Sequence, residues 1–328
     1  MTLTENIDLS DRNTLGLASR ARYGGRVSEV REILPMAEFA RGRGLPFHLI
    51  GAGSNCVLDE QIDAVVGLMD LRGRSLQHDS EDWIRMTACA GESWPELVAW
   101  TVEQGVGGLE NLAGIPGTVG AAPVQNIGAY GVEIGDIVES VTAVDTITGS
   151  FRRFAREECR FTYRNSRFKE ERGRYVLIEV TLSLPRLWKP VLSYSGLAEH
   201  FEEFDPRTVM DRVLALRHAK LPDWRVTGNV GSFFHNPIVP SALEQQFQQV
   251  PRYPVQHGIK LSAGWLIEAC GLKGHRCGGA GFYDRHALVI VNHGHATFRD
   301  VTRLAAVAVE EVKSRFGVEL VQEPVTLA

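Results

Sequence analysis

The sequence predicts a protein of the α+β class, and two observations support this class. Apolar residues recur at helical spacing in residues 93–105 and 298–316. Residues 137–185 instead form short strand-like apolar runs, the last of which, 175–185, alternates in part with the period of two that is typical of strands. The 328 residues, of which 44% are hydrophobic and 23% charged, match a soluble globular protein of two or three domains.

Composition and charge argue against several classes of protein. The formal charge of -5 argues against a nucleic-acid-binding protein, which is usually basic. The N-terminus lacks the basic and apolar regions of a signal peptide, and no apolar run approaches the roughly 20 residues of a membrane helix. The cysteines show no metal-ligand spacing, so we expect free thiols, no metal site and a cytoplasmic protein. They are Cys56, Cys89, Cys159, Cys270 and Cys277.

The N-terminal part of the chain predicts a helix followed by strands. The helix is expected over residues 28–44 despite Pro35. Residues 47–55 predict an apolar strand that runs into a tight turn, and short strands follow at 64–70 and 83–91.

Residues 93–105 carry signals for both ends of a helix. Ser93 and Glu96 have the spacing of a capping box, and Pro95 lies in the expected first turn. Gly105 is expected to end the helix.

Residues 107–131, called the glycine loop below, contain seven glycines and two prolines in 25 residues. A loop this long inside a compact domain is usually functional or disordered, and the interleaved Leu, Ile, Val and Tyr residues argue against disorder. Glycines recur every three residues around Pro116, and Gln125 and Asn126 lie near the centre. Such a rigid backbone with few side chains suits a planar ligand with a pyrophosphate. The alternative is a structural loop without a ligand.

The second half of the chain predicts strands first and helices later. The strand-rich stretch turns at Thr148-Gly149, and a change in composition at 185–190 is the best candidate for a domain boundary. Helices are expected at 208–220, 262–271 and about 298–316, with a strand at 282–292.

Several short motifs have both a functional and a plainer interpretation. The turn GAGSN at 51–55 suits phosphate binding through backbone amides, but it is not a dinucleotide fingerprint because Cys56 replaces the last glycine. A simple tight turn fits equally well. YRNSRFK at 163–169, called the basic segment below, suits either a guanidinium that binds a carboxylate or a solvated basic face.

Two further motifs favour no function by themselves. Arg217 and Lys220 lie one turn apart at the end of a predicted helix, where cations are ordinary. Glu323 precedes Pro324 after an apolar run, where a carboxylate is more often exposed than catalytic.

The segment GNVGSFFHNP at 228–237, called the serine segment below, is unusual. Loops seldom carry two adjacent large aromatic residues, and core strands seldom carry two glycines three residues apart. We therefore expect Ser232 to lie on a loop whose backbone is shaped by its glycines and packed by its phenylalanines.

Together and in this order, the motifs resemble those of the UDP-N-acetylenolpyruvoylglucosamine reductase family, specifically its longer, three-domain subgroup with a tyrosine loop. These flavoenzymes of bacterial wall-precursor synthesis are also called UDP-N-acetylmuramate dehydrogenases. The resemblance runs from about residue 13 to about residue 325. Its most specific pieces are residues 115–131, 163–169, 228–237 and 260–274.

The resemblance implies a two-part FAD-binding unit of the vanillyl-alcohol-oxidase type and a C-terminal α+β substrate-binding domain. The implied divisions are FAD-binding subdomains at 1–70 and 71–187, a substrate-binding domain at 188–318, and a C-terminal strand at 319–328 that returns to the active site with Glu323. The implied cofactors are FAD and NADPH. The residues implied to lie near the flavin or its phosphates are Gly51, Gly53, Ser54, Asn55, Ile115, Gly117, Ala121, Gln125, Asn126, Gly128 and Tyr130.

The resemblance also implies a catalytic trio of Arg164, Ser232 and Glu323. In the implied reaction, NADPH passes a hydride to the flavin, and the methylene carbon of the enolpyruvyl ether then takes that hydride. The adjacent carbon must be protonated, and Ser232 fits as the donor. Arg164 and Glu323 would polarise the substrate carboxylate, and Glu323 can donate to it only when protonated, a state that burial favours.

For the nucleotide end of the substrate, the resemblance implies contacts from Tyr194, Arg217, Lys220, Asn236, Tyr253, Lys273 and His286. The alternative for these positions is surface solvation. Ala121 and Ala122 depart from the hydroxyls that are frequent in the family, Val325 departs from an arginine, and His286 departs from an amide.

The implied partners are UDP-N-acetylglucosamine enolpyruvate and NADPH, and we expect a monomer that binds neither nucleic acid nor membranes. Two other functions stay open. One is an FAD-dependent alcohol oxidase of the same fold, and the other is a non-catalytic sugar-nucleotide-binding protein.

Overall fold

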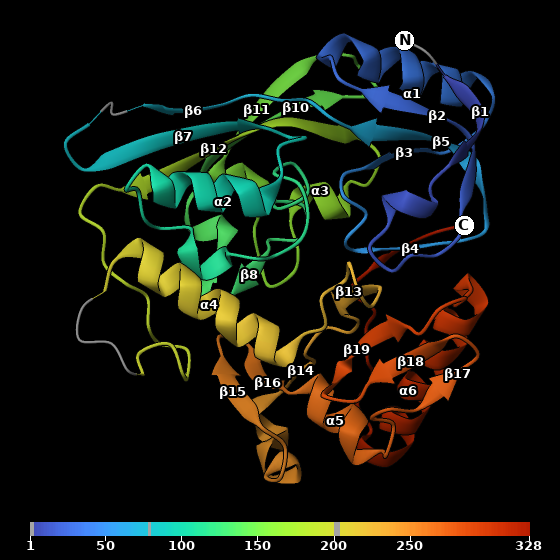
Figure 1. Cartoon of the computed structure of the whole chain (residues 1–328), viewed down its shortest axis with the longest axis vertical. Helices are drawn as coiled ribbons and strands as arrows, with labels where there is room; N and C mark the ends of the chain where they lie inside the picture. The colour runs from blue at the N-terminus through green and yellow to red at the C-terminus, as the bar shows by residue number, and fades with distance from the viewer. Residues whose placement is uncertain (1–2, 78–79, 200–203) are drawn as a thin grey trace. The chain divides into compact units, whose positions relative to one another are not determined.

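The computed structural model describes residues 3–77, 80–199 and 204–328, whose elements are drawn in Figure 1. The chain forms two compact units, each of which contains helices and strands, so the predicted α+β class is confirmed. The first unit contains Ala21–Ala52, Asp63–Ala219 and the N-terminal residues up to Ile7. The second contains Asp8–Arg20, Gly53–Ile62 and Lys220–Ala328. The finer division at residues 70, 187 and 318 stays a prediction.

A four-stranded sheet lies mainly in the first unit, with strand order β1-β2-β5-β3. Its strands are β1 Thr4–Asp8, β2 Arg20–Val27, β3 Phe47–Ile50 and β5 Gln61–Met69. Helix α1, Ile33–Gly42, packs on it through Ile33, Met36 and Ala40. The helix begins later than predicted, after a 3-10 turn at Val30–Glu32. Pro35 then lies in the first turn, where its missing N–H costs no hydrogen bond.

The second sheet of the first unit has five antiparallel strands in the order β11-β10-β12-β7-β6. They are β6 Arg74–Gln77, β7 Trp83–Cys89, β10 Val138–Asp145, β11 Phe151–Ala155 and β12 Tyr175–Pro185. Alternate residues of β7, such as Met86 and Ala88, are buried and share a core with Leu97 and Val98 of α2, Trp94–Glu103.

The capping box predicted for α2 is wrong, because the Ser93 side chain makes no capping hydrogen bond. The glycine loop instead supplies the hydrogen-bond partner at the start of the helix. The carbonyl of Gly117 accepts from the Trp94 amide at 3.0 Å, and Ser93 forms a β-bridge with Thr118. A partner distant in sequence therefore satisfies an amide at the start of the helix.

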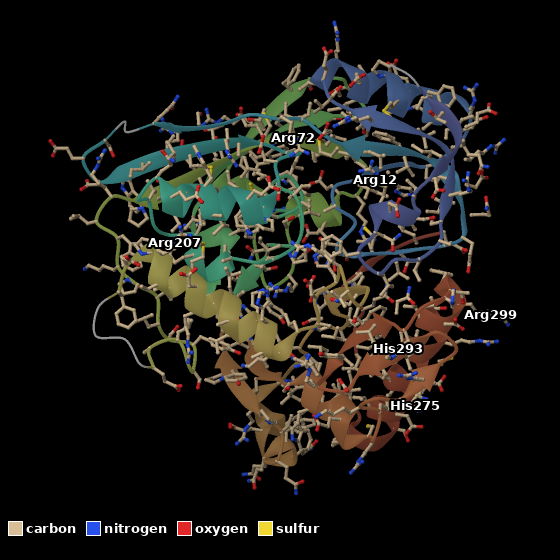
Figure 2. All side chains as sticks on the ribbon, viewed as in Figure 1. Arg12, Arg72, Arg207, His275, His293 and Arg299 are labelled. Carbon is tan, nitrogen blue, oxygen red and sulfur yellow. The ribbon has the colours of Figure 1, made fainter. Side chains whose placement is uncertain are left out.

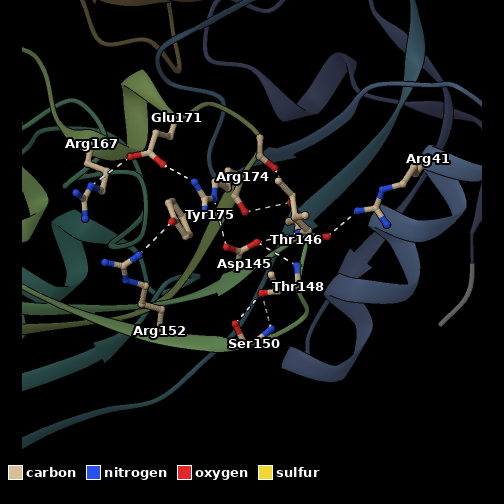
Figure 3. Close-up of polar contacts among 12 residues, drawn as sticks. Arg41, Asp145, Thr146, Thr148, Ser150, Arg152, Arg167, Glu171, Arg174 and Tyr175 are labelled. Atoms are coloured by element: carbon tan, nitrogen blue, oxygen red, sulfur yellow. Dashed lines mark hydrogen bonds and ion pairs between the residues drawn. The ribbon is translucent and has the colours of Figure 1, made fainter.

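The turn between β10 and β11 lies where the sequence predicts it, at Thr148-Gly149 (Figure 3). The Asp145 carboxylate accepts from the Thr148 amide at 3.2 Å and from Arg174 Nε at 3.3 Å. Gly149 has φ 72°, which suits glycine. Arg41 of α1 donates to a backbone carbonyl of the turn at 2.7 Å, so the turn is tied to that helix.

Short elements complete the first unit. They are β8 Gly128–Ala129, β9 Val132–Glu133, α3 Arg167–Glu170 and α4 Pro206–Lys220. The glycine loop is otherwise irregular, as predicted. Helix α4 confirms the helix expected at 208–220, and it buries Val209, Met210 and Val213 in the core of this unit.

The second unit has a four-stranded sheet in the order β13-β19-β18-β17, a three-stranded sheet in the order β14-β16-β15, and the parallel pair β20-β4. The strands are β4 Cys56–Leu58, β13 Asn229–Ser232, β14 Ile238–Val239, β15 Arg252–Val255, β16 Gly258–Leu261, β17 Arg276–Cys277, β18 Ala280–Tyr283, β19 His286–Asn292 and β20 Val325–Leu327. The single strand predicted at 282–292 is wrong. Asp284 and Arg285 form a turn between β18 and β19, and neither residue gave the glycine signal of a tight hairpin.

Helix α6, Phe298–Phe316, confirms the amphipathic helix predicted near the C-terminus. Thr297 and Asp300 form a capping box, and Gly317 follows the helix with φ 66°. The apolar stripe packs into the core of the second unit with helix α5, Ala263–Ala269.

The side chains of the described residues are drawn in Figure 2, where His275 and His293 belong to the second unit. Over residues 3–77, 80–199 and 204–328, no three His, Cys, Asp or Glu side chains gather as metal ligands. The five cysteines are free thiols, as expected. Within the same ranges, every helix is too short or too polar to cross a membrane.

Candidate functional site

The first unit brings together two motifs that the sequence singled out, the glycine loop and the basic segment. Arg164 donates to the carbonyls of Gly128 at 2.9 Å and Asn126 at 3.4 Å. The hydroxyl of the fully buried Ser166 donates to the Val124 carbonyl at 2.8 Å. These bonds join segments that lie about forty residues apart in the chain, and they orient the Arg164 guanidinium.

Three residues at this junction have an unusual backbone conformation. Asn126, Tyr130 and Arg164 have φ of 43°, 50° and 53°, in the left-handed region that L-residues seldom adopt. The Asn126 side chain supports this geometry, because it donates to Glu133 at 2.8 Å and accepts from the Gly135 amide at 2.9 Å. Strained backbone of this kind often accompanies a functional site, where the surrounding structure holds it in place.

The glycines of the first unit keep the backbone close to its neighbours. A Cβ on Gly51 would clash with Thr118, and one on Gly120 would lie 2.5 Å from the Cβ of Ala90. Gly117 has φ 148°, which strongly favours glycine. An ordered backbone with so few side chains fits the close approach of a dinucleotide cofactor.

Other predicted cofactor residues of the first unit differ in exposure. Ile115 packs against the core, and Ala121 is exposed. Ala122 is 2% exposed and packs within the core, so its methyl group does not face solvent.

Two tyrosines and an arginine form a second group in the first unit. The rings of Tyr130 and Tyr194 meet edge to face with centroids 4.7 Å apart. Arg217 of α4 lies against Gly114, where an added Cβ would be 3.2 Å from the arginine Nε. Burial lowers the pKa of the Arg217 guanidinium, although Tyr130 acts in the opposite direction. A desolvated cation beside the Tyr130 hydroxyl is suited to an anionic ligand.

The first half of the serine segment is a short strand rather than the predicted loop, because β13 runs from Asn229 to Ser232 and pairs with β19. Its two glycines have internal causes. A Cβ on Gly228 would clash with the Leu15 carbonyl, and Gly231 has φ 70° with an amide that donates to the Asn229 side chain. Contacts and backbone conformation within the second unit therefore explain both glycines.

Buried aromatic rings fix the serine, as predicted. Phe233 and Phe234 are 0% and 1% exposed, and their rings meet at a centroid distance of 5.2 Å. Ser232 itself is half-buried, so its hydroxyl is held at the edge of an apolar core.

The C-terminal segment lies beside the serine segment within the second unit. The Glu323 amide donates to the Phe233 carbonyl at 2.9 Å, and the His235 amide donates to the Val321 carbonyl at the same distance. Glu323 is therefore paired with the residue directly after Ser232. Asn55 joins them, because its side chain donates to the Glu323 carbonyl at 3.4 Å.

The GAGSN turn spans both units, with Gly51 in the first and Gly53 to Asn55 in the second. Gly53 has φ 62°, and an added Cβ would clash with the Arg12 carbonyl, so packing alone requires glycine there. Ser54 is half-buried.

Three predicted substrate residues, Asn236, Lys273 and His286, lie around α5 in the second unit. Asn236 accepts from the Ala263 amide at 3.0 Å, and Lys273 pairs with Glu268 at 2.9 Å. Burial lowers the pKa of His286, and the positive charges of Lys220 and Lys273 lower it further. Tyr253, on β15, is 60% exposed. The sequence gave no sign that Lys220, Lys273 and His286 would gather.

Arg164, of the predicted trio, belongs to the first unit, and Ser232 and Glu323 belong to the second. Sequence reasoning missed three residues that hold the predicted ones. They are Asn111, whose amide donates to the Tyr130 and Val191 carbonyls at 2.8 Å, Thr118 and Lys169. Each lies inside a motif that was recognised, but nothing in the sequence separates it from its neighbours.

Known proteins match both halves of the chain. A family model described as UDP-N-acetylenolpyruvoylglucosamine reductase, C-terminal domain, matches residues 223–327, and one described as FAD binding domain matches residues 25–155. The UDP-N-acetylenolpyruvoylglucosamine reductase of Burkholderia orbicola is 44% identical over 340 aligned residues, with 100% of this chain and 97% of the relative covered. The chain belongs to the UDP-N-acetylenolpyruvoylglucosamine reductase family.

Two other members of the family are also similar to this chain over their whole length or nearly so. The reductase of Burkholderia multivorans is 43% identical with the same coverage. A crystal structure of the UDP-N-acetylenolpyruvylglucosamine reductase from Thermus caldophilus matches with a TM-score of 0.70 at 25% identity, and 100% of both chains is covered. The resemblance stated from the sequence motifs is thus confirmed, and the FAD-binding match includes the whole glycine loop.

Proposed function

We propose that the protein reduces UDP-N-acetylglucosamine enolpyruvate to UDP-N-acetylmuramate with NADPH and bound FAD, a step in peptidoglycan precursor synthesis. The observation that carries this proposal is the pairing of Glu323 with the residue directly after Ser232. This pairing holds next to each other the two backbone segments that carry the Glu323 carboxyl group and the Ser232 hydroxyl, beside the buried Phe233 and Phe234. The family membership of the chain supports the same reaction.

The residues proposed to hold FAD fit such a group, since they offer close, ordered backbone with few side chains. Bound FAD would supply hydride transfer from NADPH to the enolpyruvyl group. The proposed residues in the first unit are Gly51, Ile115, Gly117, Ala121, Gln125, Asn126, Gly128 and Tyr130. Those in the second unit are Gly53, Ser54 and Asn55.

Ser232 is the proposed proton donor to the carbon beside the substrate carboxylate. Its hydroxyl is a weak acid, but an enolate-like carbon in a dry site is basic enough to take the proton. Gly231 and Phe233 fix the backbone on either side of the serine. Ser232 therefore loses little conformational freedom when it takes up the geometry for proton transfer.

Glu323 and Arg164 are the proposed partners of the substrate carboxylate. Glu323 serves as a donor when it is protonated, and Arg164 serves through a guanidinium that the Asn126 and Gly128 carbonyls orient. Arg164 is grouped with the other two on the strength of the sequence resemblance.

The sugar nucleotide requires cations for its diphosphate and polar or aromatic groups for its rings. The gathering of Lys220, Lys273 and His286 supports such a role in the second unit, and the aromatic pair with Arg217 supports it in the first. The proposed contacts are Tyr194, Arg217, Lys220, Asn236, Tyr253, Lys273 and His286. We further propose a monomer that works in the cytoplasm.

The function is tested with the purified protein under anaerobic conditions. We expect visible flavin absorbance that bleaches with NADPH and returns when the enolpyruvyl substrate is added. Purified protein without flavin absorbance would contradict both the proposed reductase and the alternative FAD-dependent oxidase. Flavin that bleaches but does not recover with this substrate would show that the named reaction is wrong.

A further inference from the structure

Lys169 contacts two of the residues proposed for the site. Its Nζ donates to Gln125 Oε1 at 3.1 Å and to the carbonyl of Arg164 at 2.8 Å. It belongs to the one-turn helix α3, and the Ser166 side chain caps that turn by accepting from the Lys169 amide. Because Ser166 is fully buried and donates to the Val124 carbonyl, it holds the backbone of Lys169 in place.

The contact with Gln125 selects one orientation of its carboxamide. An ammonium group only donates hydrogen bonds, so the amide atom that faces it must be the oxygen. The Gln125 amide nitrogen, a donor, is therefore turned away from Lys169. Gln125 is 8% exposed, so the carboxamide has little room to rotate.

The contact with Arg164 stabilises an uncommon backbone conformation. Arg164 has φ 53°, which costs free energy in an L-residue. The bond from Lys169 depends on where the Arg164 carbonyl points, and a return to negative φ would redirect the peptide group. The same conformation precedes the side chain that donates to the Asn126 and Gly128 carbonyls.

We propose that Lys169 is a positioning residue, which sets the carboxamide of Gln125 and the backbone of Arg164 at the same time. Through Gln125 it acts on cofactor retention, and through Arg164 it acts on the substrate carboxylate. The first part rests on the proposed contact of Gln125 with FAD, and the second part rests on the proposed reaction with the substrate. If Lys169 were only structural, its loss would lower the free energy of unfolding. Any effect on FAD retention or on the reaction with substrate would then not depend on Gln125 or Arg164.

The central variant is Lys169→Met, which keeps the aliphatic stem and removes the ammonium group. Lys313→Met is the matched control, because Lys313 is exposed on α6 and its loss changes the net charge equally. Two properties are measured on the FAD-containing protein. They are the rate of FAD release, followed by flavin fluorescence, and the rate of flavin reoxidation by the enolpyruvyl substrate.

We expect Lys169→Met to slow reoxidation by about 10- to 100-fold, as for a misplaced catalytic group, and to speed FAD release. In an Arg164→Met background the further effect of Lys169→Met on reoxidation should nearly vanish. In a Gln125→Met background its further effect on FAD release should nearly vanish. Lys313→Met should leave both properties unchanged.

The proposal is overturned if Lys169→Met matches the wild type in both measurements, or if its effects multiply with those of the partner variants to within about twofold. If Lys169→Met does not fold, Lys169→Arg replaces it, because it keeps a charged donor and should fold with both properties partly retained. The proposal is also overturned if folded Lys169→Arg releases FAD as fast as Gln125→Met and is reoxidised by substrate as slowly as Arg164→Met. If the wild type holds FAD but the substrate does not reoxidise it, the proposed function fails while FAD release still tests the Gln125 contact.

Discussion

Ser232→Ala separates the proposed chemistry from the fold more sharply than any other substitution. Ser232 pairs with Val289 of β19 through its backbone, and that pairing does not need the hydroxyl. In the described part of the chain the hydroxyl forms no hydrogen bond with another residue, and the residue is half-buried. The free energy of unfolding should therefore change by no more than about 0.5 kcal/mol.

The expected effect on chemistry is far larger. Loss of a general acid typically costs about 10²- to 10⁴-fold in rate, which corresponds to about 2.7 to 5.5 kcal/mol in the activation barrier. The loss should fall on one half of the reaction alone, because reduction of the flavin by NADPH needs no proton donor.

Anaerobic stopped-flow absorbance measures the two halves separately. We expect Ser232→Ala to bleach with NADPH at the wild-type rate and to recover its absorbance very slowly with substrate. Ser183→Ala, at a half-buried serine of strand β12, is the control for loss of a serine hydroxyl. Equal slowing of both halves would refute the assignment and make Ser232 structural, as would a wild-type rate of recovery.

Three further predictions concern the second unit. Glu323→Ala should keep the fold, because the backbone amide makes the bond to Phe233. It removes the proposed donor to the substrate carboxylate, so it should slow substrate-dependent flavin reoxidation by about 10²-fold in the same assay, and an unchanged rate would remove Glu323 from the mechanism. In urea unfolding, Gly231→Ala should cost about 1–2 kcal/mol for its φ of 70° in open space. Gly228→Ala should cost more, since its Cβ would clash with a backbone carbonyl, and the reverse order would contradict the geometry. Burial holds the pKa of His286 below 6.5, so the unfolded chain binds more protons just below that pH and stability should fall as pH drops through it. His286→Gln should flatten that dependence in urea titrations at several pH values, and an unaltered slope would rule out this histidine as its cause.

The sequence by itself determined the features that depend on near neighbours. The helical stripe and caps of α6 lie within one segment, and so do Thr148-Gly149 of the β10–β11 turn. The order of four specific motifs was enough to indicate the family, because each motif is a continuous stretch. The unusual composition of the serine segment correctly indicated that Phe233 and Phe234 are buried.

Only the tertiary structure decided which distant segments meet. The glycine loop supplies the partner for the start of α2, so the capping box that the sequence offers there is not used. The Leu15 carbonyl explains Gly228, and the pairing with Phe233 places Glu323. Lys169 looked like part of a solvated basic run until its bonds to Gln125 and Arg164 were seen. The physical reason is the same in each case: a hydrogen bond or a steric contact depends on distance in space, and local sequence patterns do not encode which remote backbone will lie within reach.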